Sequence, residues 1–183
     1  MKEKFSVKES RLKGVFQIDI RSYADERGYF LESYNKEYFE RIGIPSQFVQ
    51  DDESVSHKNV IRGLHFQKPP YAQGKLVRVI QGSIKDVVVD IRKSSPTYGQ
   101  WDAFLLGSNK KIVWMPEGFA HGFLSLEDDT LVQYKLTAPY KPECEGGLRF
   151  NDPSLGIQWG NEPFIVSEKD THQPLLSEIT PFE

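Results

Sequence analysis

The stretch LVRVIQGSIKDVVVDI, residues 76–91, is the part of the sequence that decides the fold class. It contains two apolar runs, residues 76–80 (LVRVI) and 84–91 (IKDVVVDI), which are separated by Gln81, Gly82 and Ser83. Short runs rich in valine and isoleucine are typical of β-strands. A glycine between two such runs allows the tight turn of a β-hairpin. We therefore expect residues 76–91 to fold as an antiparallel hairpin.

Similar short apolar runs follow on both sides of this stretch. A second strand pair is expected at residues 112–115 (IVWM) and 122–126 (GFLSL), joined by the turn PEGFAH, and further strands at 15–20, 29–34, 131–136 and 157–159. Many closely spaced strands with turn signals between them indicate an antiparallel sandwich or barrel. The fold class is therefore all-β. The tail after Trp159 is expected to be irregular and to wrap over the barrel.

One short helix is predicted near the N-terminus, at residues 35–42 (NKEYFERI). Asn35 can cap its first turn, and Tyr38, Phe39 and Ile42 lie on one helical face. Gly43, which follows directly, ends the helix.

Length and composition narrow the possible functions. A chain of 183 residues is long enough for one domain with a sizeable core, so a single domain over residues 1–183 is expected. The 23 Lys and Arg residues are spread along the chain and balanced by 26 Asp and Glu residues, which argues against a nucleic-acid-binding stripe. The single cysteine, Cys144, excludes an intramolecular disulfide and fits a reducing compartment. Without a signal peptide or a long apolar run, we expect a cytoplasmic protein that does not enter the membrane.

Three segments contain polar side chains that are unusual in a hydrophobic core. In residues 60–75 (VIRGLHFQKPPYAQGK), His65 and Gln67 share one face if the segment is a strand. Residues 115–123 (MPEGFAHGF) place His121 in a glycine-rich apolar setting, and residues 84–90 place Asp86 and Asp90 on one strand face. Taken singly, each has an ordinary explanation: a polar edge, a hydrogen-bonded core histidine, or an exposed strand face.

Together these segments resemble the two half-motifs of the cupin barrel. Pro116, Gly118 and His121 match the second motif, whereas the first motif has His65 but Gln67 at the position of a second histidine. No carboxylate follows in residues 68–75 (KPPYAQGK). An amide is a poor transition-metal ligand, and two histidines without a carboxylate do not form a convincing metal site. We therefore expect a barrel without a metal, whose histidines act as acids and bases.

Nine sequence blocks in a fixed order extend this resemblance over nearly the whole chain. They are DERGYFLESYN, FVQDDESVS, VIRGLHFQ, QGKLVRVIQG, DVVVDIRKSSPTYGQW, MPEGFAHGFL, YKLTAPYKP, NDPSLGIQW and SEKD. In this order they resemble the dTDP-4-dehydrorhamnose 3,5-epimerase family. The resemblance implies a homodimeric jelly-roll cupin that uses no metal or other cofactor. It also implies conversion of dTDP-4-dehydro-6-deoxy-D-glucose to dTDP-4-dehydro-L-rhamnose in the dTDP-L-rhamnose pathway.

The resemblance also implies a set of site residues. His65 matches the general base, Asp170 its carboxylate partner, and Tyr134 the opposing acid; Lys75, Asp86 and His121 complete the catalytic set. The substrate-binding positions, some of which reach the partner subunit's site, match Arg27, Phe30, Glu32, Gln50, Asp52, Arg62, Tyr140 and Glu145. Two positions depart from the family's usual pattern: Asp52 replaces an asparagine and Phe150 a tryptophan.

Three other functions remain open at this point. Some family members invert only C3 or only C5, and the matched residues do not distinguish them from enzymes that invert both. A non-catalytic cupin that binds sugar nucleotides is disfavoured, because a pure binding protein needs neither the base His65 nor the acid Tyr134. A metal-dependent cupin isomerase or dioxygenase is disfavoured by Gln67. The ketone acidifies the protons on both neighbouring carbons, so a base and an acid on opposite faces are sufficient for inversion.

Overall fold

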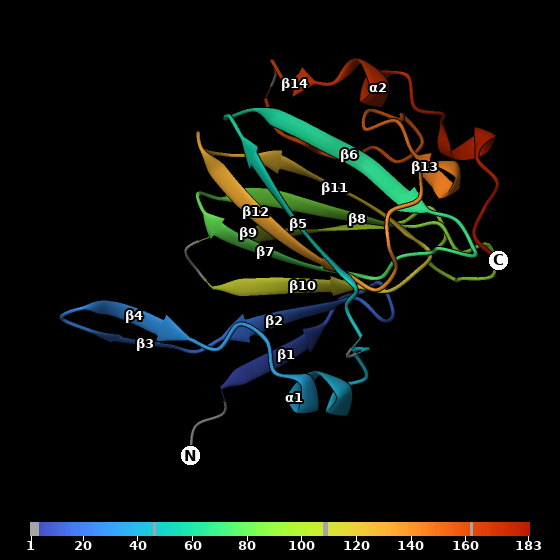
Figure 1. Cartoon of the computed structure of the whole chain (residues 1–183). Coiled ribbons are helices and arrows are strands. Elements are labelled where there is room, and N and C mark those ends of the chain that lie inside the picture. Colours follow the sequence, from blue (N-terminus) through green and yellow to red (C-terminus); the bar gives the residue numbers. More distant parts are fainter. Residues whose placement is uncertain (1–3, 46, 108–109, 162) are drawn as a thin grey trace.

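Two β-sheets packed face to face form the body of the protein (Figure 1). The computed structural model describes residues 4–45, 47–107, 110–161 and 163–183. The first sheet has the order β1 (Phe5–Glu9), β2 (Phe16–Ile20), β10 (Lys111–Met115), β7 (Lys75–Gln81), β12 (Thr130–Leu136) and β5 (Gln50–Ser56). The second has the order β13 (Glu145–Gly147), β6 (Val60–Gln67), β11 (Phe119–Ser125), β8 (Ile84–Asp90) and β9 (Trp101–Leu106). The short β14 (Ile165–Val166) adds to β6 in parallel, and β3 (Ser22–Asp25) and β4 (Gly28–Leu31) form a separate hairpin.

This arrangement confirms the all-β jelly roll but overturns the two predicted strand pairs. Strand β7 lies between β10 and β12 in the first sheet, whereas β8 lies between β11 and β9 in the second. Likewise, β10 and β11 belong to different sheets. The sequence signal was ambiguous, because a short turn between two apolar runs serves a crossing between sheets as well as a hairpin. Gly82 makes the first crossing at φ 76°, where a Cβ atom would lie 2.4 Å from the Thr130 hydroxyl oxygen.

The local predictions had mixed outcomes. Helix α1 (Lys36–Arg41) is confirmed: the Asn35 side chain accepts a hydrogen bond from the Tyr38 N–H at 3.0 Å, and Phe39 is fully buried. The strands predicted at 15–20 and 131–136 are β2 and β12, whereas only residues 29–31 of the range 29–34 are in a strand, as the end of β4. The strand predicted at 157–159 is wrong. Trp159 instead lies in a loop, where its indole donates to the Phe150 carbonyl at 2.7 Å.

Several polar or edge strands were not predicted. Strand β5 is the clearest case, because six of its seven residues are polar and five of them, QDDES, follow one another. Within the described residues it lies at the edge of the first sheet beside β12, and most of its side chains are accessible. A strand with little to bury lacks the apolar alternation that sequence patterns detect.

Three apolar clusters hold these layers together, and the third packs Phe39 of α1 against Ile18 and Trp114 of the first sheet. The first fills the space between the sheets and includes Val77, Val88 and Phe123. The second lies on the other face of the second sheet, where Leu155 and Trp159 pack against Val87 and its neighbours. Fully burying side chains of this size contributes about 1.5–3 kcal/mol each.

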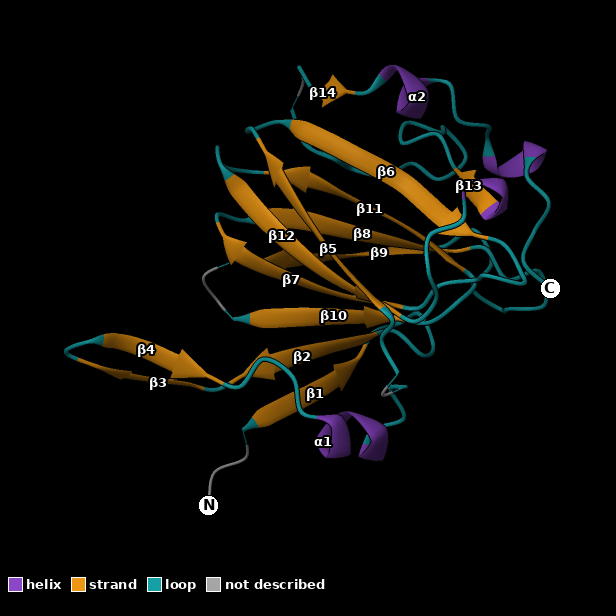
Figure 2. Ribbon diagram, in the orientation of Figure 1, coloured by secondary structure: helices purple, strands orange, loops and turns teal. Residues whose placement is uncertain are grey.

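The C-terminal tail packs over this second core, as expected, and contains more regular secondary structure than predicted. It contains β14, the single-turn helix α2 (Glu168–Thr171) and a 3-10 turn, η2 (Leu176–Glu178). Another 3-10 turn, η1 (Pro142–Cys144), precedes β13. Figure 2 shows α2 lying beside β6. No helix within the described ranges is long and apolar enough to cross a membrane.

Candidate active site

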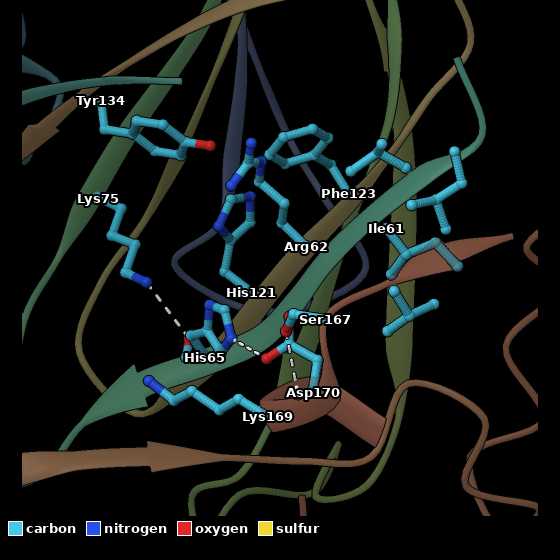
Figure 3. Close-up of a pocket in the computed structure, with 13 residues that line it drawn as sticks. Ile61, Arg62, His65, Lys75, His121, Phe123, Tyr134, Ser167, Lys169 and Asp170 are labelled. Atoms are coloured by element: carbon cyan, nitrogen blue, oxygen red, sulfur yellow. Dashed lines mark hydrogen bonds and ion pairs between the residues drawn. The ribbon is translucent and has the colours of Figure 1, made fainter. Parts of the chain in front are cut away.

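A cavity of about 530 Å³ opens between the two sheets, and the tail covers one side of it. Strands β6 and β11 contribute residues from the second sheet, and β7 and β12 contribute residues from the first (Figure 3). Its polar lining consists of Arg62, His65, Lys75, His121, Tyr134, Ser167, Lys169 and Asp170. Its apolar lining consists of Val60, Ile61, Phe123, Ile165 and Val166. All six residues predicted as catalytic are therefore in or beside one cavity, since Asp86 contacts His121 directly.

His65 and Asp170 form a hydrogen-bonded pair although they are far apart in sequence. His65 Nε2 lies 2.6 Å from Asp170 Oδ1, and Asp170 Oδ2 accepts a hydrogen bond from the Gly63 N–H at 3.1 Å. Burial alone would raise the pKa of Asp170, but the hydrogen bond and charge of His65 and the Gly63 N–H outweigh it and lower that pKa. An ionised Asp170 requires Nε2 to donate, which leaves the Nδ1 lone pair of His65 free to accept a proton.

Helix α2 sets the position of Asp170. The Ser167 side chain caps this helix by accepting a hydrogen bond from the Asp170 N–H at 3.1 Å. Strand β14, immediately before it, pairs with β6, the strand that carries His65. The tail thus brings Asp170 to His65 through its own local structure.

A second histidine–carboxylate pair lies deeper in the cavity wall. His121 Nε2 is 2.6 Å from Asp86 Oδ1, and both side chains are buried. His121 is the direct cross-strand neighbour of His65, because β11 and β6 pair at these two residues. Of the buried side-chain oxygens and nitrogens that the structure describes, Asp86 Oδ2 is the one without a hydrogen-bond partner. The two pairs differ in access: 33% of the His65 side chain is exposed, against 4% for His121.

Lys75 extends from β7 towards the same space and donates from Nζ to the His65 carbonyl at 3.3 Å (Figure 3). Burial lowers its pKa to about 8, although the negative charges of Asp86, Asp52 and Glu145 partly offset this effect. At neutral pH the side chain is therefore mainly an ammonium ion. One of its three N–H groups donates to the His65 carbonyl, and the others are available to a ligand in the cavity.

Tyr134 faces the cavity from β12, on the sheet opposite to His65 (Figure 3). Its hydroxyl lies 3.2 Å from the Ser54 hydroxyl. Burial raises the pKa of the Tyr134 phenol, and the Ser54 hydrogen bond only partly opposes this shift. The phenol is therefore neutral at working pH and carries a proton that it can donate.

Five of the predicted substrate-binding residues line the cavity or are linked to residues that line it, since Glu145 pairs with Lys169 and Asp52 is the cross-strand neighbour of Tyr134. Arg62 lines the cavity, with its guanidinium held by Ser56 Oγ at 3.0 Å. The other four residues form a hydrogen-bonded chain. The Tyr140 N–H donates to Gln50 Oε1 at 2.7 Å, and the Tyr140 hydroxyl donates to a Glu145 oxygen at 3.3 Å. Asp52 accepts from the Gln50 amide at 3.0 and 2.9 Å.

Lys169 and Ser167 line the cavity but were not predicted as site residues. Lys169 pairs with Glu145 at 2.6 Å, which places a cation beside the cavity. Both residues lie in or next to the SEKD block that identified Asp170. The signal was therefore present, but nothing local distinguishes this lysine from an ordinary surface lysine.

Arg27, Phe30 and Glu32 do not line this cavity. They lie in and just after the β3–β4 hairpin, which projects beyond the β1–β2 edge of the body, away from β6 and α2 (Figure 1). Phe30 is 70% exposed, and Glu32 pairs with Lys4 at 3.0 Å. Within a single chain, these predicted binding residues are separate from the catalytic ones.

Gln67 has a structural position instead of a place in the cavity lining. Its amide nitrogen donates to the Tyr71 carbonyl at 2.6 Å and the Pro139 carbonyl at 3.1 Å, and its oxygen accepts from the Lys141 N–H at 2.7 Å. In the described part of the chain, no three histidine, cysteine or acidic side chains are grouped so that they could hold a metal ion. Independence from metals and other cofactors stays a prediction.

A histidine–carboxylate pair facing a protonated phenol across one cavity is typical of an acid–base enzyme in a cupin-type barrel. Residues 9–178 match the family model described as dTDP-4-dehydrorhamnose 3,5-epimerase. The chain is 48% identical over 174 residues to the dTDP-4-dehydrorhamnose 3,5-epimerase of Methanothermobacter thermautotrophicus, covering 93% of this chain and 94% of that one. It therefore belongs to the dTDP-4-dehydrorhamnose 3,5-epimerase family and is an enzyme of the isomerase class.

Solved structures share the same fold. The dTDP-6-deoxy-D-glucose-3,5-epimerase of Legionella pneumophila, in complex with dTDP-4-keto-L-rhamnose, superposes with a TM-score of 0.92 at 42% identity, covering 96% of this chain and 95% of that one. A 3'-monoepimerase from Streptomyces bikiniensis, in complex with dTDP-quinovose, gives a TM-score of 0.87 at 30% identity, covering 92% and 86%. The fold is thus similar to that of enzymes with different numbers of inverted centres.

Proposed function

We propose that this enzyme inverts C3 and C5 of dTDP-4-dehydro-6-deoxy-D-glucose to give dTDP-4-dehydro-L-rhamnose. The observation that carries the proposal is the placement of His65 and Tyr134 on opposite sheets, facing one cavity. Inversion of a carbon beside a ketone needs a base on one face and an acid on the other. Residues 9–178 match the family that is named for this reaction.

Each inversion proceeds in two proton transfers. His65 removes the proton from the carbon, and the electrons of that C–H bond move into the ketone to form an enolate. Asp170 keeps the imidazole in the required tautomer and stabilises its protonated form. The ammonium group of Lys75 stabilises the charge on the enolate oxygen. Tyr134 then gives its hydroxyl proton to the same carbon from the opposite face, and water restores the resting protonation states.

Cationic side chains near the catalytic residues suit the diphosphate of the nucleotide. Arg62 and Lys169 line the cavity, and a guanidinium can form two parallel hydrogen bonds with phosphate oxygens. Tyr140, which is half-exposed near the rim, is suited to stacking on the thymine base. We place this reaction in the cytoplasm, where a free cysteine such as Cys144 stays reduced.

Double inversion is the first prediction. When the candidate substrate is incubated with the enzyme in D₂O, deuterium should enter both C3 and C5, as followed by NMR. Addition of a dTDP-4-dehydrorhamnose reductase and NADPH should then yield dTDP-L-rhamnose. Both carbons flank the same ketone, so one base and one acid can serve each if the sugar ring turns between the steps. Deuterium at a single carbon after long incubation would identify a mono-epimerase.

The separation of the β3–β4 hairpin from the cavity supports a homodimer in which each subunit completes its partner's site. Arg27 and Phe30 are exposed on this hairpin. An isologous dimer presents the same surface of both subunits to each other, so one hairpin reaching the partner's cavity implies that the other does so as well. On this proposal the nucleotide binds between the subunits.

Mixed dimers test this arrangement. The variants Arg27→Ala and His65→Asn should each be nearly inactive at low substrate concentration. After unfolding and refolding together in equal amounts, half of the dimers are hybrids, and each hybrid contains one site with both native residues. About a quarter of the wild-type activity should then return. Light scattering gives the oligomeric state independently, and a monomer, or a mixture without recovered activity, would contradict the proposal.

A further inference from the structure

The edge strand β5 presents two serine hydroxyls to residues of the cavity. Side chains alternate along a strand, so Asp52, Ser54 and Ser56 share one face of β5. The Ser54 hydroxyl lies 3.2 Å from the Tyr134 hydroxyl, and Ser56 Oγ accepts from Arg62 Nε at 3.0 Å. Arg62 also donates to the backbone carbonyl of Val55 at 3.0 Å. This strand therefore contacts both the proposed acid and a proposed phosphate-binding group.

We infer that Ser54 is a positioning residue that controls the direction of the Tyr134 proton and stabilises the phenolate formed when that proton is delivered. The inference rests on the proposed function, because it assigns a role only within that proton transfer. Ser54 acts on the substrate through Tyr134, whereas the neighbouring Ser56 anchors Arg62.

The hydrogen bond between the two hydroxyls permits two arrangements with different consequences. If Tyr134 donates to Ser54, the phenol proton points away from the substrate and cannot be transferred. If Ser54 donates to Tyr134, the phenol proton is free to point into the cavity. Ser54 is the hydrogen-bond partner of the Tyr134 hydroxyl in the part of the chain that the structure describes. It is therefore the group that can select between these arrangements.

The need for such a donor increases once the proton has left. Tyr134 is then a phenolate in a largely buried position, where desolvation and the carboxylates of Asp86 and Asp52 disfavour its charge and the guanidinium of Arg62 opposes them without cancelling their effect. A hydroxyl that donates to a charged oxygen forms a stronger hydrogen bond than one that donates to a neutral oxygen. Ser54 thus contributes more after proton transfer than before it, which is the condition for a group that accelerates a step.

Two substitutions at this position test the inference. In Ser54→Ala, kcat for inversion should fall about 10- to 100-fold, the effect of losing a hydrogen bond to a charged group. KM should change little. His65 should still exchange the substrate proton for deuterium, so the ratio of exchange to inversion should rise. Ser54→Thr keeps the hydroxyl, is well tolerated in a strand, and should restore most of the inversion rate.

Ser56→Ala is the matched comparison on the same strand face. It removes one of the two hydrogen bonds that hold Arg62 to β5 and should raise KM while leaving the ratio of exchange to inversion unchanged. A Ser54→Ala variant with a raised KM and unaltered kcat would make Ser54 a substrate contact and overturn the inference. So would an equal loss of exchange and inversion, or a Ser54→Thr variant as slow as Ser54→Ala. The wild type, measured in parallel, separates these results from failure of the proposed function, which would show neither exchange nor inversion.

Discussion

Replacing His65 with asparagine should abolish deuterium exchange at both C3 and C5 while the protein still folds and binds dTDP. We expect the exchange rate to fall about 10²–10⁴-fold, the usual contribution of a positioned general base. The Gly63 N–H and the Ser167 cap still hold Asp170, so the local structure of the tail should persist without the imidazole. NMR of the substrate in D₂O measures the exchange, and calorimetry with dTDP measures the binding.

The matched control for this variant is His57→Asn. His57 is exposed on the loop between β5 and β6 and lies outside the cavity. The same chemical change there should leave exchange at the wild-type rate. Exchange near the wild-type rate in His65→Asn itself would show that another group is the base.

The choice of His65 over His121 depends on access. Both histidines lie 2.6 Å from a carboxylate and are cross-strand neighbours, so pairing alone does not distinguish them. A base must reach a substrate proton, and His65 exposes a third of its side chain to the cavity while His121 is buried. His121 and Asp86 form a buried hydrogen-bonded pair, so His121 is poorly placed to take up a proton from the substrate.

Local signals in the sequence predicted the local features of the fold well. Asn35 caps α1 as expected because a cap depends only on a side chain and the three residues that follow it. The turn at Gly82 was predicted, but the sheet that the following strand joins was not. Whether the strand after the turn returns to the same sheet depends on contacts with distant strands such as β11, which no local pattern contains.

The site was predicted mainly through the family resemblance and only partly from the residues themselves. His65 and Lys75 were indicated by the sequence itself, because they are polar residues within or next to strand-like segments. Asp170 had no such signal, since its partner is 105 residues away and the tail that carries it looked irregular. Ser54 was overlooked because a serine in a polar stretch has no distinguishing pattern. Its relevance depends on the three-dimensional position of Tyr134.

Replacing Tyr134 with phenylalanine should separate deprotonation from inversion. The variant keeps the ring and its edge-on packing against His121, where the ring centroids are 6.2 Å apart, but it lacks the proton that inversion requires. His65 can still form the enolate and return a deuteron to the same face. Exchange should therefore continue within about tenfold of the wild-type rate, while inversion at one or both carbons falls about 10²-fold or more.

This outcome is read from product stereochemistry. An exchanged C3 or C5 carries deuterium and gives no proton signal, so the ketone is reduced chemically and the resulting 6-deoxy sugars are compared with reference sugars of known configuration. Tyr71→Phe serves as the control, since Tyr71 does not line the cavity. If Tyr134→Phe yields the wild-type product at the wild-type rate, the acid lies elsewhere. Equal loss of exchange and inversion would mean that Tyr134 acts before the proton is removed, for example by holding the substrate. Only the separated result, with deuterium incorporated and configuration retained, requires a proton donor at Tyr134 on the face opposite to His65.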